Sequence, residues 1–143
     1  MSTHQLPEGK AMDRPPVDKA DVSLRVPADG AYVSVLRTMT AGLAARLDFT
    51  VDDIEDLRIA VGEACALVLP EAQPGGDLEA EFRLTPGTLT ISVSVPTDGA
   101  RTADRDSFAW QVLTTLTRTA STASDQSRFE VTFTTESSIP VTG

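Results

Sequence analysis

DIEDLRIAVGEACALVL, residues 53–69, carries the most regular helical pattern in the chain. Its apolar side chains recur every three or four residues, which predicts an amphipathic helix with one buried face. Thr50 stands where an N-cap would stand, and Asp53 follows three residues later, so the pair resembles a capping box. Pro70 predicts the end of the helix. The predicted buried stripe consists of Ile54, Leu57, Val61, Ala64 or Cys65, and Val68.

Four segments outside this helix alternate apolar and polar residues, which predicts strands with one buried face. The Pro86–Gly87 pair between the second and third segments favours a tight turn. Because every segment keeps a polar face, we expect a largely antiparallel sheet that is wet on one side. The four segments are residues 22–26, 78–84, 89–95 and 129–133.

Two further helical patterns complete the element order. Apolar residues recur at helical spacing from Val33 to Leu47, and a third helix is predicted from Ser107 to about Thr119. The order is strand, helix, helix, strand, strand, helix, strand. This order predicts an α/β two-layer sandwich with a mixed, mostly antiparallel sheet and three helices on one face. The predicted organisation is a flexible tail (1–20), one domain (21–135) and a C-terminal tail (136–143).

Composition narrows the possible functions. The chain has 143 residues, with 12 basic and 21 acidic side chains and a formal net charge of −9. This charge disfavours direct binding of nucleic acid. Cys65 and His4 are the only cysteine and histidine, which argues against a disulfide and a cysteine or histidine metal site, so no metal site is predicted. Without a long apolar run or a signal-peptide pattern, we expect a soluble cytoplasmic protein with no membrane contact.

Glu63 is the residue most suggestive of chemistry. It is the only charged side chain between Arg58 and Glu71, and it shares a helical stripe with Ala60 and Leu67. The pattern fits an acid on the solvent side of a partly buried helix. It also fits a carboxylate that faces a pocket and is available as a general base.

A family resemblance covers about residues 21–134. Residues 53–69 resemble the second helix of the anti-sigma-factor serine kinases, the RsbW-like branch of the GHKL (histidine-kinase-type) ATPases. The preceding YVSVLRTMTAGLAARLDFT, residues 32–50, is similar to that family's first helix and connecting turn. SFAWQVLTTLTRTAS, residues 107–121, resembles the helix after its nucleotide lid, particularly in the actinobacterial members.

The resemblance implies a nucleotide site, but this sequence departs from its motifs. Glu63 matches the family's acidic general base, whereas Leu67 stands where the family has an asparagine that ligates Mg²⁺. Only Asp98 and Gly99 remain of an Asp-x-Gly-x-Gly motif. The glycine-rich lid aligns with Ser107 and Ala109, and Ser107 is better interpreted as an N-cap. We therefore expect lost or weak kinase activity and assign no cofactor, with ATP and Mg²⁺ as the open alternative.

The resemblance also implies partners. Arg37 lies where the family has an arginine that contacts the sigma factor, and we expect it to be exposed. The predicted function is that of an anti-sigma factor, acting as a homodimer, that sequesters a stress- or sporulation-type sigma factor. A STAS-type anti-anti-sigma protein would release it. The alternatives are an active ATP-dependent serine kinase that phosphorylates this antagonist through Glu63, and a small-molecule-sensing pseudokinase of the same fold.

Overall fold

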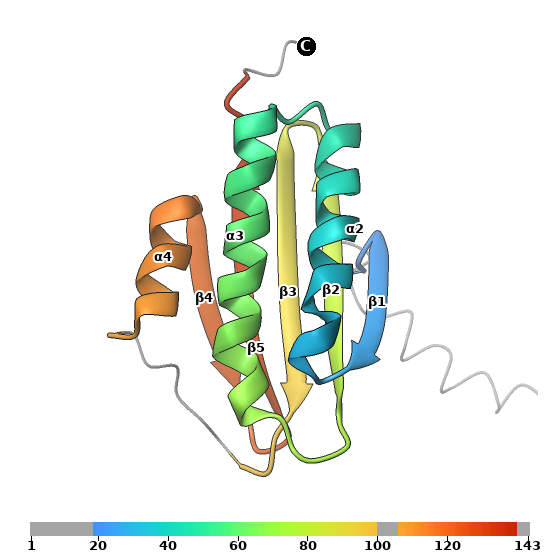
Figure 1. Ribbon diagram of the computed structural model, residues 1–143, viewed down its shortest axis with the longest axis vertical. Coiled ribbons are helices and arrows are strands. Elements are labelled where there is room, and N and C mark those ends of the chain that lie inside the picture. The colour runs from blue at the N-terminus through green and yellow to red at the C-terminus, as the bar shows by residue number, and fades with distance from the viewer. Residues whose placement is uncertain (1–18, 100–105, 140–143) are drawn as a thin grey trace, which may run out of the picture.

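A five-stranded sheet carries three α-helices on one face, as the computed structural model shows (Figure 1). The structure describes residues 19–99 and 106–139, so most of the predicted N-terminal tail, with His4, lies outside the described residues. The elements are β1 (Val22–Pro27), α2 (Val33–Arg46), α3 (Val51–Val68), β2 (Asp77–Thr85), β3 (Thr88–Pro96), α4 (Phe108–Leu116), β4 (Thr119–Ser124) and β5 (Arg128–Glu136), with 3₁₀ turns η3 (Gly30–Tyr32) and η4 (Leu69–Glu71).

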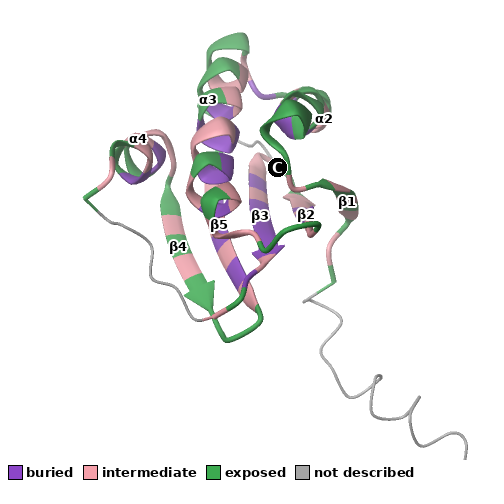
Figure 2. Cartoon of the chain, turned by 60° about the horizontal axis from the view of Figure 1, so that its bottom comes forward, coloured by how far each residue is buried: buried purple, intermediate pink, exposed green. Residues whose placement is uncertain are grey.

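The strands lie in the order β1-β2-β3-β5-β4, and all four pairings are antiparallel. The predicted two-layer sandwich is therefore confirmed, with no parallel pair among the described strands. Buried residues line the inner face of the sheet and the helix faces turned toward it (Figure 2). The largest fully buried side chains include Phe82, Phe129, Phe133, Leu36, Leu57 and Leu113.

The N-terminus of α3 has the predicted capping box. The amide of Asp53 donates to Thr50 Oγ1 at 3.1 Å, and the amide of Thr50 donates to Asp53 Oδ2 at 3.3 Å. The same Oδ2 accepts bonds from the amide and the hydroxyl of Ser138, both at 2.9 Å. The segment after β5 is thus tied to the start of α3. This segment falls within the proposed C-terminal tail, 136–143, and β5 itself includes Glu136.

The third helix is shorter than predicted, and a strand follows it that the sequence pattern did not indicate. Helix α4 ends at Leu116, and Thr117 is already extended (φ −125°, ψ 161°). The amide of Arg118 then donates to the carbonyl of Thr134 at 2.8 Å, which starts β4 beside β5. The sequence TASTAS of β4 contains no large apolar residue, so its alternation could not be recognised.

Candidate functional site

Three segments that are far apart in the sequence lie at the same end of the helix layer. These are the C-terminal half of α3, the C-terminal end of β3 and the N-terminal end of α4 (Figure 1). Residues 100–105, between β3 and α4, lie outside the described residues. The fold therefore gathers the predicted nucleotide- or ligand-pocket positions at one end, namely Glu63, Leu67, Asp98, Gly99, Ser107 and Ala109.

Glu63 is a half-buried residue in the C-terminal half of α3. It lies one turn after Ala60, which is fully buried, and one turn before Leu67, which packs against the core. Within the described part of the chain, no hydrogen bond or ion pair engages Glu63. Its carboxylate is therefore available to a ligand.

The other predicted positions offer little to a phosphate or a metal. Leu67 presents only hydrocarbon, and Asp98 is exposed beyond the end of β3. Ser107 is the N-cap of α4, because its Oγ accepts a 3.1 Å hydrogen bond from the amide of Trp110. Among residues 19–99 and 106–139, no cluster of acidic, histidine or cysteine side chains could hold a metal ion.

Thr97 was missed by the sequence analysis. It continues the inward alternation of Val93 and Val95, so its side chain faces the helix layer just beyond β3. Only 3% of Thr97 is exposed, and its hydroxyl has no hydrogen-bond partner among the described residues. A buried hydroxyl without a partner is costly, so Thr97 Oγ1 is a candidate contact for a bound molecule. The two-residue period of β3 could have revealed its direction, but not its lack of a partner.

Arg37 is a residue of α2 whose guanidinium lies against Gly62 of α3, and it is half-buried rather than exposed as predicted. Thr40, about one turn later in α2, is fully buried, and its hydroxyl donates a 2.7 Å bond to the carbonyl of Leu36. A Cβ placed on Gly62 would lie 2.5 Å from Arg37 Nη2, so the missing side chain makes room for the guanidinium. No acid in the described ranges forms an ion pair with Arg37.

Cys65 is a buried core residue, and it lies close enough to Arg37 for the positive charge of the guanidinium to affect the pKa of its thiol. Burial raises the pKa of the thiol to about 12, although the positive charge of Arg37 opposes the rise. The thiol therefore stays protonated at neutral pH and is a poor nucleophile. This agrees with the predicted packing role. The arginine is distant in sequence, so its proximity could not be foreseen from the neighbours of Cys65.

Comparisons with known proteins agree with this fold. The serine-protein kinase RsbW of Halalkalibacterium halodurans is 40% identical over 88 residues, which are 61% of this chain and 52% of that protein. RsbW of Bacillus anthracis is 36% identical over 75 residues, or 51% of this chain and 47% of that protein. The chain thus spans about half the length of these relatives.

A solved structure and a family model extend the match across the fold. The crystal structure of the RsbU and RsbW domains of Rv1364c from Mycobacterium tuberculosis superposes with a TM-score of 0.64 at 17% identity. It covers 83% of this chain and 33% of that one, and at this identity it shows the fold alone. The family model described as histidine kinase-like ATPase domain matches residues 26–131. The predicted RsbW-like resemblance is confirmed, and the chain belongs to the histidine kinase-like ATPase domain family.

Proposed function

We propose that this protein is an anti-sigma factor that sequesters an alternative RNA polymerase sigma factor of the stress or sporulation type. The environment of Arg37 carries the proposal. Its guanidinium is half-buried, is positioned by the space at Gly62 and has no acidic partner among the described residues. A cation held in this way loses little freedom when it binds a carboxylate, and arginine can make two parallel hydrogen bonds to that carboxylate. The chain is similar to proteins named serine-protein kinase RsbW, and the RsbW-like resemblance described above implies the same function.

Inhibition would follow from occlusion. A sigma-factor helix that places an acidic side chain on Arg37 would lie along α2 and could not contact the polymerase at the same time. A STAS-type antagonist would release the sigma factor by binding an overlapping surface. We further propose that the protein acts as a homodimer in the cytoplasm, where its partners function. The described residues contain no helix long and apolar enough to cross a bilayer.

The residues present do not fit Mg²⁺-dependent phosphoryl transfer. A magnesium ion needs oxygen ligands, and Leu67 supplies none at the position where the resembling family has asparagine. Glu63 alone cannot replace that ligand, because it is the proposed base. We therefore propose that kinase activity is lost or weak and that sigma-factor binding does not need ATP.

A second function is favoured by Thr97. Within residues 19–99 and 106–139, neither the buried hydroxyl of Thr97 nor the carboxylate of Glu63 has a partner, and both residues belong to the same end of the helix layer. Together they would suit a small molecule that both donates and accepts hydrogen bonds. In this alternative, the protein is a sensing pseudokinase that couples a metabolite to sigma-factor release. A thermal-shift panel of metabolites and nucleotides tests it, and the idea fails if no compound raises the unfolding midpoint.

The main proposal is tested first by identifying the partner. Tagged protein is used to capture partners from native cell extract, with and without Mg·ATP, and mass spectrometry identifies them. We expect a sigma factor under both conditions. Capture of a STAS protein alone, phosphorylated when ATP is present, would instead establish the kinase.

Arg37→Glu then tests the proposed contact. We expect the substitution to weaken sigma-factor binding roughly 100-fold, because it places like charges at the interface, without loss of the fold. Calorimetry with purified sigma factor measures the affinity, and circular dichroism checks the fold. Arg46→Glu is the matched control, since Arg46 is an exposed arginine in the last turn of the same helix. Equal affinity of the Arg37 variant and the native protein would exclude Arg37 from the interface.

A further inference from the structure

Strand β4 forms an open edge of the sheet. Among the described residues it pairs only with β5. The amide of Asp125 donates to the carbonyl of Arg128 at 3.0 Å, so Asp125 and Arg128 form a hydrogen-bonded pair. From that pair the register runs back along β4, and the backbone groups of every second residue bond to β5. The backbone N–H and C=O groups of Ala120 and Thr122 consequently point away from β5. They offer a ladder that another strand could complete.

The opposite edge of the sheet is protected in a way that β4 is not. Strand β1 ends at Pro27 and carries Arg25, which forms a 3.1 Å ion pair with Glu79. Charged residues and proline discourage the addition of a further strand. The sequence TASTAS of β4 contains neither, and four of its six residues are exposed. Its short side chains leave the edge accessible.

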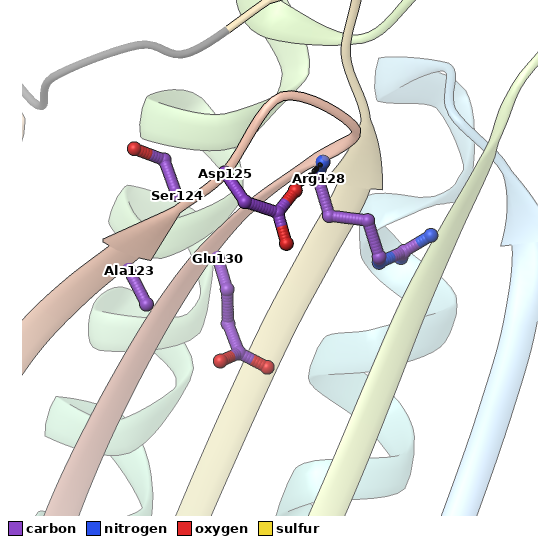
Figure 3. A pocket seen from close by; sticks show the side chains of 5 residues that line it. All are labelled: Ala123, Ser124, Asp125, Arg128 and Glu130. Atoms are coloured by element: carbon purple, nitrogen blue, oxygen red, sulfur yellow. Dashed lines mark hydrogen bonds between the residues drawn. The ribbon is translucent and has the colours of Figure 1, made fainter.

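A hollow of about 220 Å³ lies beside β4 on the face of the sheet that carries no helix (Figure 3). Ala123 lies directly opposite Glu130 in the β4–β5 register, and the short methyl side chain leaves space next to the longer acid. Figure 3 shows the Glu130 carboxylate lying over the sheet, with the helices behind it. The lining residues are Ala123, Ser124, Asp125, Arg128 and Glu130.

The charges around this hollow favour a cation. Arg128 is already engaged, since its Nη2 donates to Ser94 Oγ at 2.6 Å and lies 3.5 Å from Glu79 Oε1. Glu130 has no ion pair within the described residues, and burial together with the nearby charge of Glu81 raises its pKa. Hydrogen bonds from Ser127 and Arg128 lower the pKa of Asp125, so that carboxyl stays ionised at neutral pH.

We propose that β4 binds an extended segment of a partner protein as an added strand, with a lysine or arginine of that segment opposite Ala123. Residues opposite Ala123 would form a non-hydrogen-bonded pair, in which side chains approach closely. A long basic side chain at that position would cross the methyl group and reach Glu130 and Asp125. Backbone pairing would provide affinity, and the acidic hollow would select the basic residue. This interaction does not depend on the proposed sigma-factor contact, which lies on α2.

The probe is the peptide Thr-Val-Thr-Lys-Thr-Val-Thr-amide, which carries fluorescein at its N-terminus through a Gly-Gly linker so that the lysine keeps its charge. A set of such peptides varies the residues that flank the lysine. Fluorescence anisotropy measures binding to the full chain, and ¹H–¹⁵N spectra locate it. We expect chemical-shift changes concentrated on β4. A peptide methylated on alternate backbone nitrogens should not bind measurably, because it cannot form the ladder. Replacement of the lysine by glutamate should weaken binding roughly fivefold or more.

Three protein variants distinguish the contribution of backbone pairing to peptide binding from the contribution of the acidic hollow. Thr122→Pro removes an outward N–H and should abolish binding, since proline is tolerated on an edge strand where the N–H faces solvent. Ala123→Lys fills the hollow with an internal cation opposite Glu130, so it should block the peptide without loss of stability. Glu130→Gln should weaken binding roughly threefold to fivefold. Glu55→Gln, an exposed acid on α3, is the charge-matched control and should bind normally.

Several results would overturn the proposal. These are equal binding of the N-methylated peptide, shift changes away from β4, and no binding by any peptide of the set at millimolar concentration. A chain lacking residues 1–18 that binds the peptide more tightly would identify the chain's own N-terminal segment as the occupant. Dimerisation that Thr122→Pro abolishes, measured by light scattering, would instead assign the edge to a second copy.

Discussion

Two threonines that face the protein interior illustrate how much one hydroxyl can differ from another. Thr40 is fully buried, but its hydroxyl donates to the carbonyl of Leu36 one turn earlier in α2. Thr97 is almost as buried, and its hydroxyl has no partner among the described residues. Its burial therefore carries a desolvation cost that nothing nearby offsets.

Thr97→Val should stabilise the protein by about 1 kcal/mol, because it removes the unpartnered hydroxyl and keeps the side-chain shape. Urea unfolding measures the change in the free energy of unfolding. Thr40→Val is the matched control and should be neutral or destabilising. If a metabolite raises the melting temperature of the native protein, Thr97→Val should reduce that increase. A destabilised Thr97 variant would show that its hydroxyl is satisfied after all.

Asp53 forms both a local and a long-range contact at the start of α3. It belongs to the capping box with Thr50, and its carboxylate accepts hydrogen bonds from Ser138 in the segment after β5. Its partial burial tends to raise its pKa, but hydrogen bonds from Ser138 and Thr50 outweigh that effect, so the net shift is downward. A carboxyl with a lowered pKa in the folded state stabilises the protein above its unfolded pKa, near 3.8. That contribution disappears as the pH falls through the folded value.

Asp53→Asn should therefore destabilise the protein by about 1 kcal/mol at neutral pH, the usual contribution of a helix cap. The difference from the native protein should shrink in acid, where the native carboxyl also loses its charge. Chemical unfolding at several pH values measures both effects. Asp52→Asn is the control, since Asp52 is exposed in the same helical turn without a capping bond. A difference independent of pH would rule out the charged form of Asp53 as the source.

At the scale of elements, a strand could be recognised in the sequence only where its buried positions carry large apolar side chains. The alternation of large apolar residues in β1, β2, β3 and β5 was strong enough to identify these strands, and the capping box located the start of α3. Strand β4 was missed because TASTAS buries almost nothing and is held by backbone bonds to β5. The burial of Arg37 was also missed, because it depends on Gly62 of a neighbouring helix.

The α2–α3 contact leads to a paired glycine experiment. A Cβ on Gly42 of α2 would meet nothing within 4 Å, whereas a Cβ on Gly62 would collide with the guanidinium of Arg37. Gly42→Ala should stabilise the protein by up to about 1 kcal/mol, the usual gain in helix propensity. Gly62→Ala should gain less, because Arg37 must move.

The same pair tests whether Gly62 positions Arg37 for its partner. Gly62→Ala should weaken sigma-factor binding roughly tenfold, and it should have no further effect in an Arg37→Ala background. Calorimetry on the two single variants and the double variant gives the coupling. Gly42→Ala should leave the affinity unchanged. Additive losses in the double variant would mean that Gly62 acts on binding without Arg37.

At the scale of the whole molecule, the layer architecture could be predicted from the element order, but the candidate ligand site could not be predicted from the motifs. Glu63 and Leu67 could be placed on one helical stripe from their spacing. Whether Glu63 and Thr97 find partners among the described residues depends on how α3, α4 and the end of β3 come together, which only the assembled fold determines. The acidic balance, in contrast, is visible directly in the sequence.

The net charge of −9 predicts that the rate of association with a basic partner depends on ionic strength. The association rate with a sigma factor should fall roughly tenfold between low and physiological ionic strength, because salt screens long-range attraction. The dissociation rate should change much less. Stopped-flow fluorescence measures both rates, and a neutral solute at matched viscosity is the control. An association rate independent of salt would show that the acidic surface does not attract this partner.

The strand order also has a consequence for synthesis on the ribosome. Strand β5 comes last in chain order among the described strands, yet it lies inside the sheet between β3 and β4. Until β5 has left the exit tunnel, β4 has no strand to pair with and the inner edge of β3 is bare. The hydrogen bond from the amide of Ser138 to Asp53 Oδ2 also cannot form until Ser138, 85 residues later in the chain, has been synthesised. A nascent chain that stalls before β5 would therefore expose two unpaired strand edges, and such chains are the ones that chaperones must shield.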